Sequence, residues 1–171
     1  KIKICGITSE NDIEFLNEAG VDYAGFVQFF PKSKRNIPTG RAAKLMQGLD
    51  PGIEKVAVVV GLDAAQLKSL EEAGFDRIQI HGNVEDDVLS QSTLPVWKAF
   101  NVGNALDLAE FARYEACDRV DGYVFDAHVP GSGRPFDWEI LEKLPETRKQ
   151  VILAGGLNPD NVKEAAKIPF I

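Results

Sequence analysis

The sequence has few of the residues that form disulfide frameworks or metal sites. Its 171 residues include two cysteines, Cys5 and Cys117, and two histidines. Two cysteines are too few for a disulfide scaffold, and no CxxC pair or mixed histidine–cysteine cluster indicates zinc. Because disulfides are rare in reducing compartments, this usage predicts a cytoplasmic protein.

Positive charge and long apolar runs are also scarce. A net charge of −7 argues against a general nucleic-acid-binding protein, which would carry a basic face. No apolar run approaches the ~20 residues of a membrane span, and the first residues contain no long apolar segment of the secretory type. The expected partner is therefore a small molecule rather than nucleic acid or a membrane, bound by a monomer or a homodimer.

Short β-branched runs alternate with amphipathic stretches along the whole chain. Runs of the strand type cover residues 1–5, 23–29, 55–60, 77–81, 96–100, 122–126 and 151–154. This alternation predicts right-handed βαβ units and a parallel sheet. The run "KVAVVV" is apolar on both faces, as in a strand covered by helices.

About seven βα units followed by "KIPFI" predict an α/β fold of the (β/α)8 TIM barrel type, with residues 1–171 forming a single domain. An open doubly wound sheet is the alternative, which is disfavoured because no GxGxxG follows the first strand. The eighth βα unit is missing from these residues. We expect roughly 25–40 further C-terminal residues, enough for one strand and one helix, and a truncated barrel is the alternative.

Helix boundaries are marked by local signals. Ser9 with Asp12 three residues later predicts a helix start, and Gly20 predicts its end. The longest helix pattern covers residues 104–117. It places four apolar residues on one side: Leu106, Ala109, Ala112 and Ala116.

Several polar or small residues stand where the predicted strands end, which is where a βα barrel has its active site. They are Cys5, Gln79, His81, Asp126, Gly155 and Gly156. Each has a structural explanation as well, since buried cysteines, core histidines and tight glycine turns are common. The acid that ends the apolar run "GYVF" is harder to explain by structure alone. The basic loop "FFPKSKRN" after the second strand is either a solvated loop or part of the site.

Five segments, taken in order, resemble the phosphoribosylanthranilate isomerase family of tryptophan biosynthesis: "KICGIT", "GFVQFFPKSKRNI", "IQIHG", "FDAHVPGSGRPFDW" and "LAGGLNPDNV". The resemblance implies a (β/α)8 barrel enzyme. It also implies an Amadori rearrangement that converts N-(5-phosphoribosyl)anthranilate to 1-(2-carboxyphenylamino)-1-deoxyribulose 5-phosphate, with no cofactor and no metal.

The resemblance assigns the two proton-transfer roles that this reaction needs. Asp126 is the general acid that protonates the ring oxygen, and Cys5 is the general base that removes the proton from C2. Asp126 must therefore carry a proton at neutral pH, whereas Cys5 must reach its thiolate form. Side-chain alternation places Lys3 on the same face as Cys5, and a cation there favours the thiolate.

The resemblance also assigns substrate-binding residues. Arg35 holds the anthranilate carboxylate, for which a planar guanidinium is suited. Gln79 and His81 lie near the substrate, and Gly155 and Gly156 form half of a phosphate site. The segment "HVPGSGRP" is expected to be a mobile loop that covers the site.

Two other functions are compatible with the residues taken without the resemblance. The first is another phosphosugar isomerase or epimerase, although that class usually needs several metal-binding residues at its strand ends. The second is a non-catalytic or truncated βα-barrel binding protein.

Overall fold

The computed structural model describes residues 1–103, 106–127, 136–169 and 171. The chain divides into two compact units, Lys1–Val96 and Trp97–Ile171. The expectation of one domain over residues 1–171 stays a prediction.

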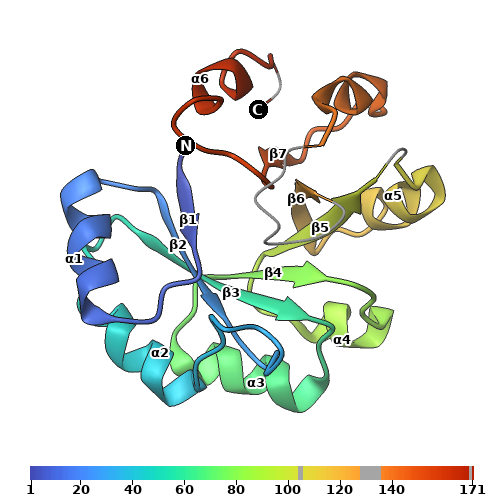
Figure 1. The fold of residues 1–171 in the computed structure, drawn as a ribbon. Coiled ribbons are helices and arrows are strands. Elements are labelled where there is room, and N and C mark those ends of the chain that lie inside the picture. The colour runs from blue at the N-terminus through green and yellow to red at the C-terminus, as the bar shows by residue number, and fades with distance from the viewer. Residues whose placement is uncertain (104–105, 128–135, 170) are drawn as a thin grey trace. The chain divides into compact units, whose positions relative to one another are not determined.

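The first unit contains four βα repeats in chain order (Figure 1). Its strands are β1 (Lys3–Cys5), β2 (Tyr23–Val27), β3 (Glu54–Val60) and β4 (Arg77–His81). Its helices are α1 (Glu10–Ala19), α2 (Thr39–Met46), α3 (Ala64–Ala73) and α4 (Asp86–Gln91). All neighbouring strands pair in parallel, in the order β1-β2-β3-β4.

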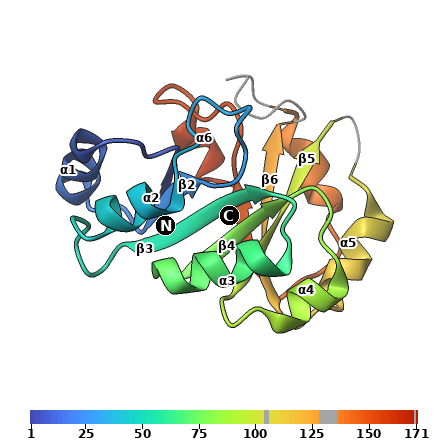
Figure 2. The same cartoon turned by 90° about the horizontal axis from the view of Figure 1, so that it is seen from below.

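One face of this sheet is closed by the helices that follow its strands, and α2 and α3 lie along it in Figure 2. Phe26, Val59 and Ile80 are completely buried on this face, and the Phe26 ring contacts the ring of Phe75, which follows α3. Because side chains alternate along a strand, Cys5 belongs to the opposite face.

The predicted boundaries of α1 are confirmed. The Ser9 hydroxyl accepts a hydrogen bond from the Asp12 N–H, and the Asp12 carboxylate accepts one from the Ser9 N–H, so the two residues form a capping box. Gly20 ends the helix in the left-handed conformation.

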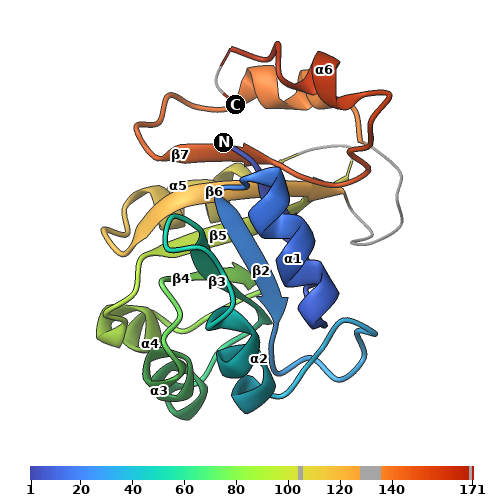
Figure 3. The same cartoon turned by 90° about the vertical axis from the view of Figure 1, so that its left-hand side faces the viewer.

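The second unit contains β5 (Val96–Val102, whose first residue belongs to the first unit), β6 (Val120–Ala127) and β7 (Gln150–Leu153). It also contains α5 (Leu108–Glu115), the 3-10 helix η1 (Trp138–Lys143) and α6 (Val162–Ala165). Strands β6 and β7 run side by side in parallel (Figure 3).

An aromatic cluster forms the core of this unit. Phe111 and Tyr114 of α5 both pack against Phe100 of β5, and Phe111 also contacts Tyr123 of β6. Phe125 of β6 stacks on Phe100. The alanine side of α5 is not the buried side, since Ala109 and Ala112 are exposed, and the helix begins at Leu108 rather than near residue 104. Aromatic side chains bury more apolar area than alanines do, so the side of α5 that carries Phe111 and Tyr114 faces the core.

Candidate active site

Cys5 is the last residue of β1, as predicted, and it pairs directly with Gly25 of β2. A Cβ atom placed on Gly25 would lie 3.0 Å from Cys5 Sγ and 3.0 Å from Lys3 Nζ. The thiol and the ammonium group therefore occupy the same small region, on the face opposite the helices. Cys5 is exposed, Lys3 is half-buried and Gly25 is buried.

Arg35 lies across the turn that follows Cys5. A Cβ atom on Gly6 would collide with the aliphatic part of Arg35, since Cγ would be 3.2 Å and Nε 3.0 Å away. Gly6 also has a φ of 92°, a left-handed value that other residues rarely adopt. The left-handed turn therefore requires glycine at this position, and the absence of a side chain lets Arg35 approach the end of β1.

The loop that carries Arg35 is held by local hydrogen bonds. Asn36 Oδ1 accepts from the Phe30 N–H at 2.8 Å, and the Ser33 hydroxyl accepts from the Arg35 N–H at 3.2 Å. Gln28, which is completely buried, donates through Nε2 to the carbonyls that flank the loop, Val27 O at 2.9 Å and Ile37 O at 3.2 Å. These bonds tie both ends of the loop to the end of β2.

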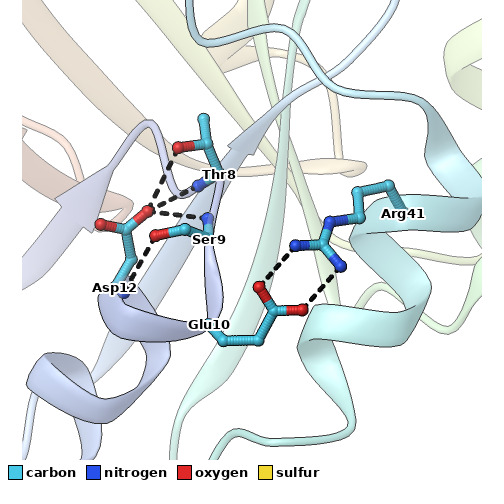
Figure 4. A network of polar contacts seen from close by, with 5 residues as sticks. All are labelled: Thr8, Ser9, Glu10, Asp12 and Arg41. Carbon is cyan, nitrogen blue, oxygen red and sulfur yellow. Dashed lines mark hydrogen bonds and ion pairs between the residues drawn. The ribbon is translucent and has the colours of Figure 1, made fainter.

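A polar network fixes the start of α1, directly after the "KICGIT" segment (Figure 4). Asp12 accepts from the N–H groups of Thr8 at 2.8 Å and Ser9 at 2.9 Å. Beside it, Glu10 and Arg41 form a bidentate ion pair at 2.6 and 2.7 Å between α1 and α2. The turn after Cys5 is therefore anchored to α1, and α1 is in turn joined to α2.

Gln79 and His81 lie on one face of β4, as predicted, and both are buried. Gln79 Nε2 is 2.9 Å from His81 Nε2. Because an amide nitrogen only donates, the histidine nitrogen accepts this bond. Among the described residues, no donor satisfies Gln79 Oε1. An unpaired buried carbonyl is costly, so this oxygen is suited to accept a bond from a bound molecule.

In the second unit, Asp126 lies near the end of β6, where it is half-buried. Its Oδ1 accepts from the N–H of Ala127 at 2.8 Å. A Cβ atom on Gly155 would be 2.6 Å from that same Oδ1 and would also collide with the Ala127 backbone. Gly155 therefore lies directly against the carboxylate, and its φ of 80° independently requires glycine.

The turn after β7 continues through Gly156, which also has a left-handed φ, of 68°. The Gly156 carbonyl accepts bonds from Asn161 Nδ2 at 2.9 Å and Asn158 Nδ2 at 3.3 Å. Asn158 in turn caps the following turn by accepting from the N–H groups of Asp160 and Asn161. Two asparagines therefore hold the glycine turn in place.

The described residues form neither a metal-binding cluster nor a membrane-spanning helix. They contain no group of three or more histidine, cysteine or acidic side chains that could hold a metal ion. In the same part of the chain, no helix has the length and apolar character needed to cross a membrane. The loop predicted to cover the site, residues 128–135, lies outside the described residues.

Comparison with known proteins identifies the family of this chain. The family model described as N-(5'phosphoribosyl)anthranilate (PRA) isomerase matches residues 2–171. The chain belongs to this isomerase family. The phosphoribosylanthranilate isomerase of Clostridium acetobutylicum is 37% identical over 99% of this chain and 84% of its own length.

Solved structures of phosphoribosylanthranilate isomerases share the fold. The Thermus thermophilus enzyme aligns with a TM-score of 0.84 and 30% identity, covering 98% of this chain and 82% of that chain. Another isomerase, in complex with reduced 1-(o-carboxyphenylamino)-1-deoxyribulose 5-phosphate, aligns with a TM-score of 0.79 and 29% identity, covering 99% of this chain and 84% of that chain. The predicted fold class and the predicted enzyme class are confirmed.

Several residues that were not predicted from the sequence of this isomerase shape the surroundings of the predicted ones. Gly6 and Gly25 lie against Arg35 and Cys5, and Gln28 and Asn36 hold the Arg35 loop. One signal was available in the sequence. Gln28 interrupts an apolar run, and a polar residue in such a run needs buried hydrogen-bond partners.

Proposed function

We propose that this phosphoribosylanthranilate isomerase converts N-(5-phosphoribosyl)anthranilate to 1-(2-carboxyphenylamino)-1-deoxyribulose 5-phosphate with Asp126 as general acid and Cys5 as general base. Membership of the isomerase family gives the reaction. The roles of Asp126 and Cys5 come from the resemblance of their segments to the family, and one observation supports them. Cys5 and Asp126 each stand at the carboxyl end of their strand, as the last residue of β1 and the second-last residue of β6. That end is where βα-barrel enzymes carry their catalytic groups.

The acid step opens the ribose ring. The proton of the Asp126 carboxyl group goes to the ring oxygen, the bond between that oxygen and C1 breaks, and the nitrogen lone pair forms a protonated Schiff base. The Asp126 carboxylate that remains keeps the hydrogen bond from the Ala127 N–H, which orients it. Gly155 limits the space on one side of Oδ1, so the group has few other orientations.

The base step forms the enolamine. The Cys5 thiolate takes the proton from C2, and the electron pair of the C–H bond moves towards the positively charged nitrogen. The enolamine then tautomerises to the ketone. Lys3 contributes a positive charge beside the sulfur, on the same face of β1. A positioned proton-transfer group of this kind contributes about 100-fold or more to the rate.

The remaining residues bind the parts of the substrate that do not react. Arg35, exposed above Gly6, presents a guanidinium to the anthranilate carboxylate. Because Gly155 and Gly156 have no side chains, the phosphate can come close to the backbone N–H groups of the turn after β7. Gln79 Oε1 accepts from a substrate hydroxyl, and His81 orients the glutamine through the bond to its amide nitrogen.

The proposal is tested by measuring isomerisation through the loss of anthranilate fluorescence. Cys5→Ala and Asp126→Asn should each lower kcat by about 100-fold or more. The matched controls are Cys117→Ala, which removes the other cysteine, and Asp118→Asn, which changes an exposed aspartate. Both controls should retain the parental kcat.

Either assignment fails if its variant turns over at nearly the parental rate. Circular dichroism on each variant separates a catalytic loss from a loss of fold. Because the two substitutions lie in different units, they are tested independently, and one role can survive the failure of the other.

A further inference from the structure

The backbone of Gly25 lies so close to Cys5 that no side chain fits at position 25 without a steric clash. A Cβ atom there would lie 3.0 Å from Cys5 Sγ, 3.0 Å from Lys3 Nζ and 3.2 Å from Cys5 Cα. Non-bonded atoms of this size prefer about 3.5–4.0 Å. Even the smallest side chain would therefore press on the thiol, the ammonium group and the backbone of β1 together.

These three atoms differ in how they can respond. Lys3 Nζ is the end of a flexible chain, which can move aside at low cost. The Cys5 backbone is held by the β1–β2 ladder, and the N–H groups of Gly6 and Ile7 both donate to the Gly25 carbonyl, at 2.8 and 3.1 Å. The sulfur has one rotatable bond, so it can escape only by turning to a different staggered position.

We propose that Gly25 is a positioning residue for Cys5: the absence of a side chain at position 25 leaves the space in which the thiol takes its working orientation. The inference rests on the proposed role of Cys5 as the general base. Gly25 acts through Cys5. A side chain at this position turns the sulfur away and lowers turnover without removing the thiol.

The test uses Gly25→Ala in a Cys117→Ser background, which leaves Cys5 as the single thiol. A displaced catalytic group costs up to about 100-fold, so kcat should fall by about 10- to 100-fold with little change in KM. Alkylation by iodoacetamide reports on the sulfur itself: the thiolate displaces iodide and forms a thioether, and the thiol proton goes to water. A sulfur that has turned to a different staggered position is reached differently by the reagent, so the alkylation rate should change.

The matched control is Gly40→Ala, at a position where a Cβ atom meets nothing within 4 Å. This control should keep the parental kcat and alkylation rate. A Gly25→Ala variant that behaves like Gly40→Ala overturns the inference. If Cys5→Ala is itself fully active, the proposed base role fails instead, so the two failures can be told apart.

A third comparison shows which contact matters. In a Lys3→Met background the ammonium group is gone but the contact with the sulfur remains, so Gly25→Ala should still lower kcat by the same factor. If the effect disappears in that background, Gly25 acts through Lys3 and the inference is wrong. Double-variant comparisons of this kind isolate one pairwise interaction.

Stability provides a readout that needs no activity and allows for a Gly25→Ala protein that folds poorly. The fall in Tm caused by Gly25→Ala should be smaller in a Cys5→Ala background, because the sulfur that meets the new methyl group is absent. An equal fall in both backgrounds contradicts the proposed contact.

Discussion

Asp12 provides a test of how the turn after Cys5 is held. Its carboxylate accepts from the N–H groups of Thr8 at 2.8 Å and Ser9 at 2.9 Å, and from the Thr8 hydroxyl at 3.3 Å (Figure 4). Asp12→Ala removes all three acceptor contacts. It leaves the capping residue Ser9 with its own bond to the N–H of residue 12.

The magnitude follows from these bonds. Each of the two backbone bonds contributes about 1 kcal/mol net, so Asp12→Ala should lower the free energy of unfolding by about 2 kcal/mol. For a chain of this length, that corresponds to a fall in Tm of about 4–8 °C. Asp12→Asn keeps an acceptor oxygen without the charge and should lose less. Glu14→Ala, on the exposed side of the same helix, is the matched control and should change Tm little.

The effect of Asp12 also has a defined pH dependence. Partial burial is the largest influence and raises the pKa of Asp12, but hydrogen bonds from the backbone and hydroxyls of Thr8 and Ser9 together outweigh it, so the pKa is lowered. A carboxyl whose pKa is lower in the folded protein contributes stability above its unfolded pKa of about 3.9, and this contribution is lost as pH falls through the folded value. The Tm difference between parent and Asp12→Asn should therefore shrink below about pH 4.

Thermal unfolding followed by circular dichroism from pH 7 to pH 3 measures both predictions. The reasoning is refuted if Asp12→Ala matches Glu14→Ala at pH 7. It is also refuted if the difference between parent and Asp12→Asn stays constant down to pH 3.

Two further predictions concern charged groups. If Arg35 holds the anthranilate carboxylate, Arg35→Ala should raise KM by about 10- to 100-fold, the range for losing a hydrogen bond to a charged group. The neighbouring control Lys34→Ala should leave KM unchanged. A substrate analogue without the carboxylate should bind the parent and Arg35→Ala with the same affinity. Lys98 Nζ is buried 3.0 Å from Glu110 Oε1, so Glu110→Ala leaves the ammonium charge without its carboxylate partner and should lower the free energy of unfolding in urea by about 3 kcal/mol. The exposed control Glu142→Ala should lower it little. Because burial lowers the pKa of Lys98, the folded variant loses the ammonium proton at a lower pH than the unfolded chain does. The loss of unfolding free energy caused by Glu110→Ala should therefore shrink as pH rises from 7 to 10. A loss that does not change with pH contradicts this.

Local features of the fold were predictable from the sequence. All seven strands appear within a few residues of their predicted positions, and the Ser9–Asp12 capping box is present. Both depend on neighbours a few residues apart. The buried side of α5 was not predictable from spacing, because alanines and aromatic residues both gave a helical stripe. Contacts of Phe111 and Tyr114 with Phe100, and of Phe111 with Tyr123, decided which side is buried.

The sequence by itself also determined which residues stand at strand ends, since that follows from where each apolar run stops. Only the tertiary structure shows what lies against them. The pairing of β1 with β2 brings Gly25 against Cys5, twenty residues away in the chain, and the turn after β7 brings Gly155 against Asp126. Contacts of this kind depend on strand register and backbone direction. Neither quantity is encoded in the spacing of residues along one strand, so the space around each proposed catalytic group was set by the fold.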